Sequence, residues 1–227
     1  MSKNNLIVMA LLALFIATLP AGAQVKLGII GGLNIANLNG EDADGSNIDF
    51  SSRTALGVGG ILDIGLSENV ALRLEPMYLQ KGGKFDATDP DLGTATFTFK
   101  AGYLEVPAFL KIALGTNTTR PYLMAGPAIG VNLSPKVNLS ASGVSLETDA
   151  DKITKSTDFG LGFGAGVSFP AGSSSIFVEG RYVLGLTDIA RAGTLSFMGA
   201  ELPVDDANIK TRGLQFMAGI TFPLGGK

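Results

Sequence analysis

From residue 25 onward, hydrophobic residues alternate with small or polar residues in stretches that recur along the whole chain. Period-two alternation indicates a β-strand with one apolar face, because a helix would repeat every three to four residues. Eight such segments occur, and each is close to the 9–11 residues with which a tilted strand crosses a bilayer. They cover residues 25–37, 53–66, 70–84, 97–114, 121–133, 157–169, 174–188 and 213–224.

The connections between these segments alternate in length. Residues 67–69, 115–120 and 170–173 are short turns, whereas long polar loops occupy 38–52, 85–96, 134–156 and 189–212. Bacterial outer-membrane barrels have short periplasmic turns and longer extracellular loops. The spacing therefore predicts an all-β fold, an eight-stranded antiparallel up-and-down transmembrane β-barrel with short periplasmic turns and long extracellular loops.

The two faces of the predicted strands differ in composition. One face is almost wholly apolar, while the other carries charged residues diluted with glycine and alanine. A soluble lipocalin-like barrel would place the apolar face inside, but its outer face would then be dense in charge. Because the polar face here is largely glycine, we expect the apolar face to contact lipid and the glycine-rich face to line a filled lumen.

Glycine occupies every second position within "DFGLGFGAGVSF", residues 158–169. Glycine weakens a strand, so this face must need room for large neighbours. A four-residue turn at 170–173 would pair Phe169 with Ser174, and the turn at 115–120 would pair Leu114 with Pro121. Both registers place glycines opposite large inward side chains, which predicts a lumen that is closed to solutes.

Seven charged residues on the inward face form the candidate site. Buried charges need partners, so we interpret them as a structural charge network rather than as catalytic acids and bases. The turn at 67–69 sets Asp63 directly opposite Arg73, a favourable cross-strand pair. Large apolar residues such as Phe109 and Phe177 share this face. The predicted network comprises Asp63, Arg73, Glu75, Glu105, Lys111, Glu179 and Arg181.

The composition excludes the commonest catalytic mechanisms. The 227-residue chain has no His and no Cys, which excludes Ser-His-Asp and Cys-His catalysis, thiol nucleophiles and disulfides. Its net charge of -3 argues against nucleic acid as a partner, because phosphate binding requires clustered Lys and Arg. We therefore expect a protein that is not an enzyme and that has no cofactor and no catalytic or metal-binding residues.

Two short motifs carry alternative interpretations. Asp42, Asp44 and Ser46 have the spacing of a calcium-binding loop, but Asn47 and Arg53 stand where glycine and glutamate are expected. We interpret the segment as a solvated acidic loop and leave calcium binding open. "LGIIGGLN" lacks both the G-x-G-x-x-G spacing and a following helix, so it does not predict a dinucleotide site.

The N-terminus has the pattern of a secretory signal peptide. Lys3 precedes an apolar run over 6–19, and Ala21-Gly22-Ala23 forms a small-residue cleavage site. The run is shorter than the 20 or so residues of a membrane-spanning helix, which argues against an uncleaved anchor. We expect a cleaved signal peptide over 1–23 and a single exported domain over 24–227, located in the cell outer membrane.

Seven segments stand in order along the chain: "GIIGGLN", "LRLEPMYLQKGG", "YLEVPAFLKI", "PYLMAGPAIGVNL", "DFGLGFGAGVSF", "VEGRYVLGLTDI" and "LQFMAGITFPLG". In these segments the chain from residue 24 onward resembles the outer-membrane β-barrel domain family, whose members include PorT-like proteins. The resemblance implies contact with outer-membrane lipid and the barrel-insertion machinery, and PorT-like relatives are associated with protein secretion. The chain departs from the pattern at its end, where "PLGGK" follows the aromatic residue Phe222.

Three functions are compatible with these patterns. The first is a non-enzymatic outer-membrane barrel with a filled lumen, whose surface loops serve interaction with an envelope or extracellular protein partner, or envelope integrity. The second is a transport role, as a small pore or a secretion accessory. The third is a soluble lipocalin-like barrel that binds an apolar ligand.

Overall fold

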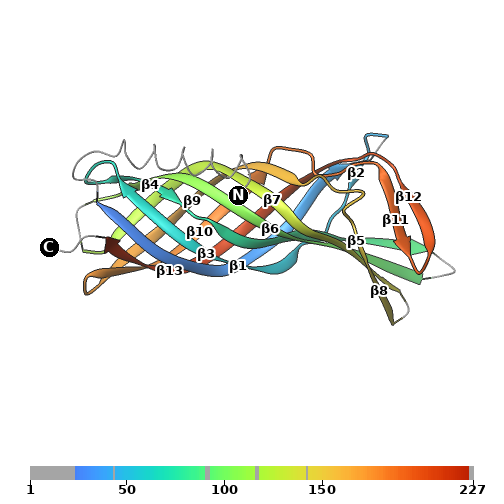
Figure 1. Cartoon of the computed structure of the whole chain (residues 1–227), viewed down its shortest axis with the longest axis horizontal. Helices are drawn as coiled ribbons and strands as arrows, with labels where there is room; N and C mark the ends of the chain where they lie inside the picture. The colour runs from blue at the N-terminus through green and yellow to red at the C-terminus, as the bar shows by residue number, and fades with distance from the viewer. Residues whose placement is uncertain (1–23, 43, 90–92, 116–117, 142, 225–227) are drawn as a thin grey trace, which may run out of the picture.

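The computed structural model describes residues 24–42, 44–89, 93–115, 118–141 and 143–224. Its main sheet is antiparallel and closes into a ring, because β1 pairs with both β13 and β3 (Figure 1). The ring has eight strand positions, as predicted. These are β1 (Val25–Glu41), β3 (Arg53–Gly65), β4 (Val70–Leu74) with β5 (Met77–Asp89), β6 (Gly93–Ala113), β7 (Arg120–Ala141), β9 (Thr157–Ala171), β10 (Ser174–Gly185) and β13 (Asn208–Leu224).

The predicted signal peptide at residues 1–23 lies outside the described residues, as do Ala43 of the acidic loop and the last three residues. Within the described part of the chain, no helix is long and apolar enough to cross a membrane.

The segment predicted as one strand over 70–84 is divided into β4 and β5 by Glu75 and Pro76. Proline has no backbone N–H to donate to a neighbouring strand. Its carbonyl still accepts a hydrogen bond of 2.9 Å from the N–H of Gly60. The register continues unchanged across the break, because β4 pairs Asp63 with Arg73 and β5 pairs Gly59 with Met77. Inward and outward positions therefore keep their parity.

The lumen is filled by side chains. Phe109 and Tyr122 are at most 1% exposed, and they pack with methionines and aliphatic residues from several strands. Phe109 and Phe177, predicted to lie inside, are buried, and so are Met77, Met124 and Met217. Glycines opposite them provide the room, and Glu105 lies opposite Gly130 in the predicted register.

The register predicted across the 170–173 turn is wrong by two residues. Ser174 pairs with Ala171, and Phe169 pairs with Ile176. The chain reverses through only two residues, because Gly172 adopts a φ of +66° that favours glycine in a tight hairpin. A shift of two residues preserves the faces, so each glycine still points inward.

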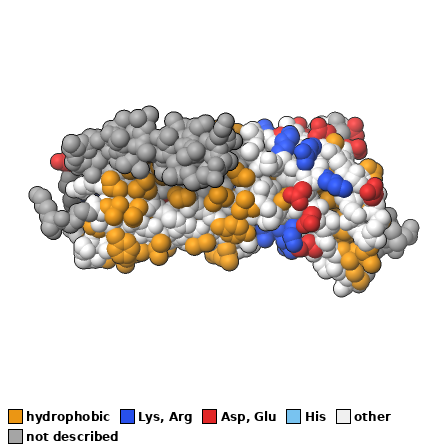
Figure 2. Space-filling view, viewed as in Figure 1, with side chains coloured by type: hydrophobic (Ala, Val, Ile, Leu, Met, Phe, Trp, Pro, Cys, Tyr) orange, Lys and Arg blue, Asp and Glu red, His pale blue; other side chains and the backbone are white. Residues whose placement is uncertain are grey.

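The outer surface carries a band of exposed apolar side chains. Leu161 and Phe163 of β9 are 45% and 50% exposed, although Leu62 and Ile64 of β3 are less exposed than their neighbours at the same parity. Figure 2 shows hydrophobic side chains over the half of the molecule that holds the short turns, and charged side chains beyond it. The apolar face is therefore outside, as predicted.

The long connections are more ordered than the predicted polar loops. They contain β2 (Asn47–Ile48), β8 (Val144–Asp149), β11 (Gly193–Phe197) and β12 (Ala200–Val204), and β5, β6 and β7 continue into them. Figure 1 shows β8, β11 and β12 together at the end of the molecule opposite the short turns. A second hydrophobic cluster lies here, formed by Val137, Ala150, Leu195 and Phe197, with Phe97, Phe99, Leu139, Leu146, Ile153 and Val204 packed against it. We call this region the outer platform.

Candidate functional site in the barrel lumen

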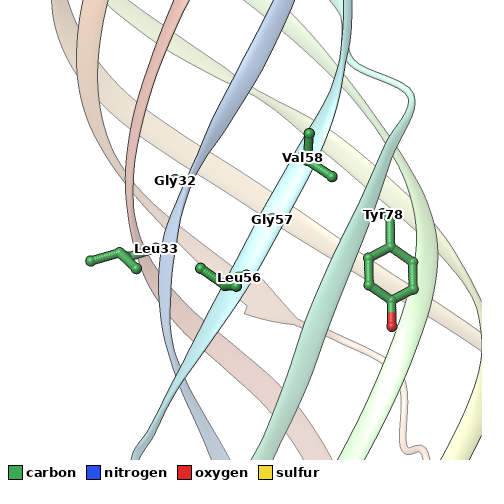
Figure 3. Close-up of a pocket in the computed structure, with 6 residues that line it drawn as sticks. All are labelled: Gly32, Leu33, Leu56, Gly57, Val58 and Tyr78. Atoms are coloured by element: carbon green, nitrogen blue, oxygen red, sulfur yellow. The ribbon is translucent and has the colours of Figure 1, made fainter.

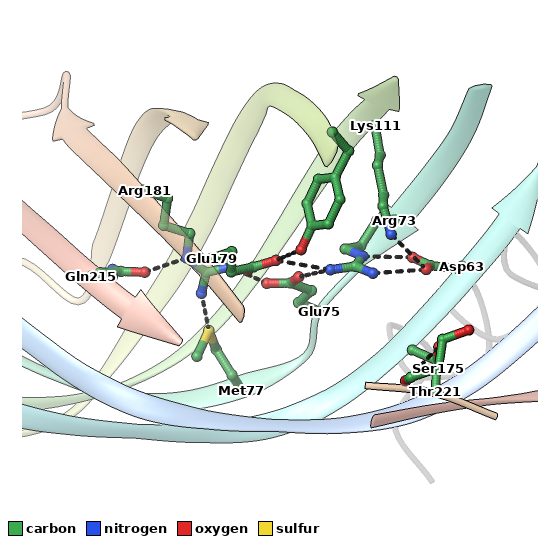
Figure 4. A network of polar contacts seen from close by, with 11 residues as sticks. Asp63, Arg73, Glu75, Met77, Lys111, Ser175, Glu179, Arg181, Gln215 and Thr221 are labelled. Atoms are coloured by element: carbon green, nitrogen blue, oxygen red, sulfur yellow. Dashed lines mark hydrogen bonds and ion pairs between the residues drawn. The ribbon is translucent and has the colours of Figure 1, made fainter. Parts of the chain in front are cut away.

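Most of the predicted site residues meet in one cluster inside the barrel (Figure 4). It contains three cations and three carboxylates, so its formal charges sum to zero. Each side chain is almost completely buried except that of Lys111, which is 15% exposed. We call it the central cluster, and its members are Asp63, Arg73, Glu75, Lys111, Glu179 and Arg181.

Arg73 links the two sides of the central cluster. Its Nε donates to Oδ1 of Asp63 at 2.6 Å and its Nη2 donates to Oδ2 at 2.8 Å, which is a bidentate pair. Its Nη1 donates to Oε2 of Glu179 across the lumen at 3.0 Å. Asp63 lies directly opposite Arg73 in the ladder, and the Leu66 N–H donates to the Val70 carbonyl in the turn. The predicted register of this hairpin is therefore confirmed.

Arg181 has the corresponding position on β10. Its guanidinium contacts the carboxylate of Glu75 and donates to Oε1 of Glu179 at 3.3 Å. Its Nε donates to the side-chain oxygen of Gln215 at 2.5 Å. Gln215 was not predicted as a site residue. Its inward parity on β13 and its polar amide between Leu214 and Phe216 were the signals that could have identified it.

Glu105 is separated from the other predicted site residues. It contacts Lys81, whose Nζ also donates to Oδ2 of Asp158 at 2.9 Å. Thr211 donates to the same oxygen at 2.7 Å. We call Lys81, Glu105 and Asp158 the outer cluster. Asp158 was not predicted from the sequence, although it has the parity of the inward glycines that follow it.

Both clusters connect strands on opposite sides of the lumen. Every carboxylate in them has a cation within ion-pair distance. Glu75 and Glu105 each keep one oxygen without a hydrogen-bond donor among the described residues. Within those residues there is no group of three or more metal-binding side chains arranged to hold an ion. The arrangement joins β4 to β10 and β5 to β9 through the lumen.

Comparison with known families identifies the fold independently. The profile of the outer membrane protein beta-barrel domain matches residues 20–191, which is more than half of the chain. The chain belongs to this family. It is a small outer-membrane β-barrel protein. A comparison with curated proteins found no match.

Solved outer-membrane barrels are similar to this outer-membrane protein in fold. OprG from Pseudomonas aeruginosa is 14% identical, with a TM-score of 0.52 over 90% of this chain and 98% of OprG. A major outer membrane protein from Thermus thermophilus is 9% identical, with a TM-score of 0.50 over 89% of this chain and 100% of the other. The outer membrane protease OmpT from Escherichia coli also matches, with 12% identity and a TM-score of 0.45 over 88% of this chain and 97% of OmpT.

The outer face of this outer-membrane barrel has a shallow apolar groove of about 300 Å³. Leu33, Leu56, Val58 and Tyr78 line it beside Gly32 and Gly57, on three neighbouring strands (Figure 3). Because it opens on the apolar band, we expect lipid chains to contact it.

Charged groups outside the membrane-spanning segments form separate pairs on the outer platform and its connections. The hydrogen bond of 2.8 Å between Lys136 and Glu147 raises the pKa of Lys136 and lowers that of Glu147. Burial acts to raise the pKa of Asp188, but Lys155 and the backbone N–H groups of Ala190 and Ile209 donate to its carboxylate. These donors outweigh burial and hold the pKa of Asp188 below its usual range.

Proposed function

We propose that this protein is a non-enzymatic outer-membrane barrel with a closed lumen that presents the outer platform for interaction at the cell surface or for envelope integrity. The folded core of the platform is the observation that carries this proposal. Mobile loops would not bury residues such as Leu195 and Phe197, both 7% exposed, beyond the membrane band. A packed platform on a rigid barrel is a preorganised binding surface, and preorganisation lowers the entropic cost of binding.

The closed lumen supports a role without transport. An eight-stranded barrel has an interior that side chains can just fill, and here the central cluster and the apolar core occupy it. The buried carboxylates support a role without catalysis, because each already has a cationic partner. We propose that the mature domain spans 24–227 and reaches the outer membrane after cleavage of a signal peptide at 1–23.

A transport or secretion role, suggested by the PorT-like resemblance, is the second candidate. A secretion accessory would also use the outer platform or the periplasmic turns, and it would differ in its partner. The soluble lipocalin-like alternative is not supported, because the apolar face lies on the outside of the barrel.

The proposal can be tested by removing the β11–β12 hairpin from the outer platform. In the test variant, residues 193–204, which form the β11–β12 hairpin, are replaced by a short Gly-Ser linker. The matched control carries the same linker inserted after Gly172, at the opposite end of the barrel. Heat-modifiable migration on a gel verifies that both barrels are folded.

In intact envelopes, we expect the hairpin variant to form fewer cross-links to other proteins than the wild type does, or to make the envelope more sensitive to detergent. The control variant should show neither change. A hairpin variant that matches the wild type in both measurements would refute a role for the platform. Loss of secreted proteins without loss of surface cross-links would instead favour the secretion candidate.

A further inference from the structure

The short-turn end of the barrel contains a cavity of about 710 Å³. This volume lies within the range of pockets that hold small molecules. Its rim is formed by the turns at 65–71, 118–122 and 168–175 together with the start of β1. We call it the vestibule, and because short turns of outer-membrane barrels face the periplasm, we expect it to open there.

The vestibule ends blindly at the central cluster. Asp63, Lys111 and Tyr122 form its inner wall. Lys111 Nζ lies 3.5 Å from Oδ2 of Asp63 and 4.2 Å from the centre of the Tyr122 ring. Tyr122 is only 1% exposed and donates to Glu179 at 2.6 Å. A molecule that enters the vestibule therefore meets a fixed wall, so the cavity is suited to binding and not to passage.

The charges that line the vestibule are unbalanced toward positive. Three cations, Lys26, Lys111 and Arg120, face two carboxylates, Asp63 and Glu68. The Asp63 carboxylate already accepts hydrogen bonds from Nε and Nη2 of Arg73. Among the described residues, neither Lys26 nor Arg120 has a carboxylate within ion-pair distance. A concave site with low-dielectric walls concentrates such a positive potential.

The remaining lining is suited to a polar organic molecule. Its polar lining residues can form hydrogen bonds with a ligand, and Leu66 and Val70 add apolar surface. The polar residues are Ser67, Asn69, Thr118, Ser168 and Ser175. Carboxylates and phosphates accept several charge-assisted hydrogen bonds from Lys and Arg at once. We propose that the vestibule is a binding site for a small organic oxyanion, presented from the periplasmic side, with Lys26, Lys111 and Arg120 as its cationic contacts.

The proposal does not depend on the partner of the outer platform, and its test uses the purified full-length barrel in an uncharged detergent. Succinate and glycerol 3-phosphate are titrated as probes, with glycerol as the uncharged control, and binding is followed by calorimetry and by amide chemical shifts near Arg120. The test variants are Lys26→Gln and Arg120→Gln, both at the rim. Lys26 lies opposite Asp63 in the β1–β3 ladder, but among the described residues it forms no ion pair with it. The control is Lys136→Gln, which removes a cation at the other end of the molecule.

We expect saturable binding of at least one anion, weakened by roughly tenfold or more in each rim variant, as for the loss of a charge-assisted hydrogen bond, and unchanged in Lys136→Gln. Preference for one probe then assigns the site to carboxylates or to phosphates. The proposal is overturned if neither anion binds, if glycerol binds equally well, or if folded Lys26→Gln and Arg120→Gln barrels bind as the wild type does.

Discussion

At the scale of single residues, the buried pair of Asp63 and Arg73 gives the sharpest test of the lumen network. Removing one partner leaves the other charge buried and unpaired, which costs about 3–5 kcal/mol. The cost of Asp63→Ala should lie near the lower end of this range, because Asp63 lines the vestibule and water can reach the site from there. We expect Asp63→Ala and Arg73→Ala each to lower the free energy of unfolding strongly, and the double variant to cost clearly less than their sum. Urea unfolding in lipid vesicles measures all three.

An exposed ion pair is the matched control. The side chains of Lys136 and Glu147 are 44% and 39% exposed, so water replaces a lost partner and surface pairs contribute little. Removing either of them should leave the unfolding transition unchanged within error. Additive effects at Asp63 and Arg73 would show that the two side chains are not energetically coupled.

Asp188 predicts a pH dependence confined to the last long connection. Because its pKa is lowered in the folded protein, its contribution to stability is present above the unfolded value of about 3.9 and is lost as pH falls through the folded pKa. The amide resonances of Ala190 and Ile209, whose N–H groups bind Asp188, should shift with a midpoint below about 3.9. In Asp188→Asn this transition should be absent, and its persistence would assign the titration to another group.

Which residues could be predicted from the sequence depended on how their positions were constrained. Asp63 and Arg73 flank a three-residue turn, so the turn alone fixed their pairing. Lys81 is on β5, the strand that precedes β6 and Glu105, and it contacts Glu105. Its second partner, Asp158, comes from β9, and no local turn connects β9 to either strand. The sequence therefore predicted that these charges face inward, but it could not divide them into two clusters.

At the scale of the strand, the glycine face of β9 should tolerate no side chain. A Cβ at Gly166 would clash with Cζ of Tyr122 and lie 2.8 Å from Cβ of Glu179, and these two residues hydrogen-bond to each other. We expect Gly166→Ala to destabilise the barrel by about 1–3 kcal/mol, as overpacking does. Thermal or urea unfolding in vesicles would measure the loss.

Gly180 provides the control for this substitution. It faces outward on β10, and a Cβ there would approach nothing closer than 3.8 Å. Gly180→Ala should be neutral or slightly stabilising, because alanine restricts the unfolded chain more than glycine does. Equal losses in the two variants would mean that backbone conformation, and not room in the lumen, explains the glycines.

Turn and loop conformations limited the prediction at this scale. The alternation specified the faces of the strands, but the positive φ of Gly172 shortened a hairpin that looked longer in sequence. Similarly, Phe97, Phe99 and Leu139 continue the alternation past the membrane band, and only tertiary packing with the β11–β12 hairpin distinguishes an ordered platform from a polar loop.

At the scale of the whole molecule, the filled lumen predicts the absence of ion flow. Tyr122 and the central cluster close the vestibule, and Phe109 and Met77 pack in the apolar core of the lumen. We expect purified protein in planar bilayers to give no stable single-channel steps, with a known porin as the positive control. Reproducible steps of uniform size would contradict a closed lumen and would favour the transport candidate.

The links between β4 and β10 also have a consequence for biogenesis. Arg73 and Glu179, like Arg181 and its carboxylate partner Glu75, are 106 residues apart in sequence. Until strands from both halves of the chain meet, four charges lack these partners, and a half-assembled sheet would present them to hydrocarbon. Such an intermediate is costly, so closure is expected to be all-or-none. We therefore expect the network to act as a checkpoint on assembly, because a chain truncated before β10 lacks Glu179 and Arg181, the partners of Arg73 and Glu75 across the lumen.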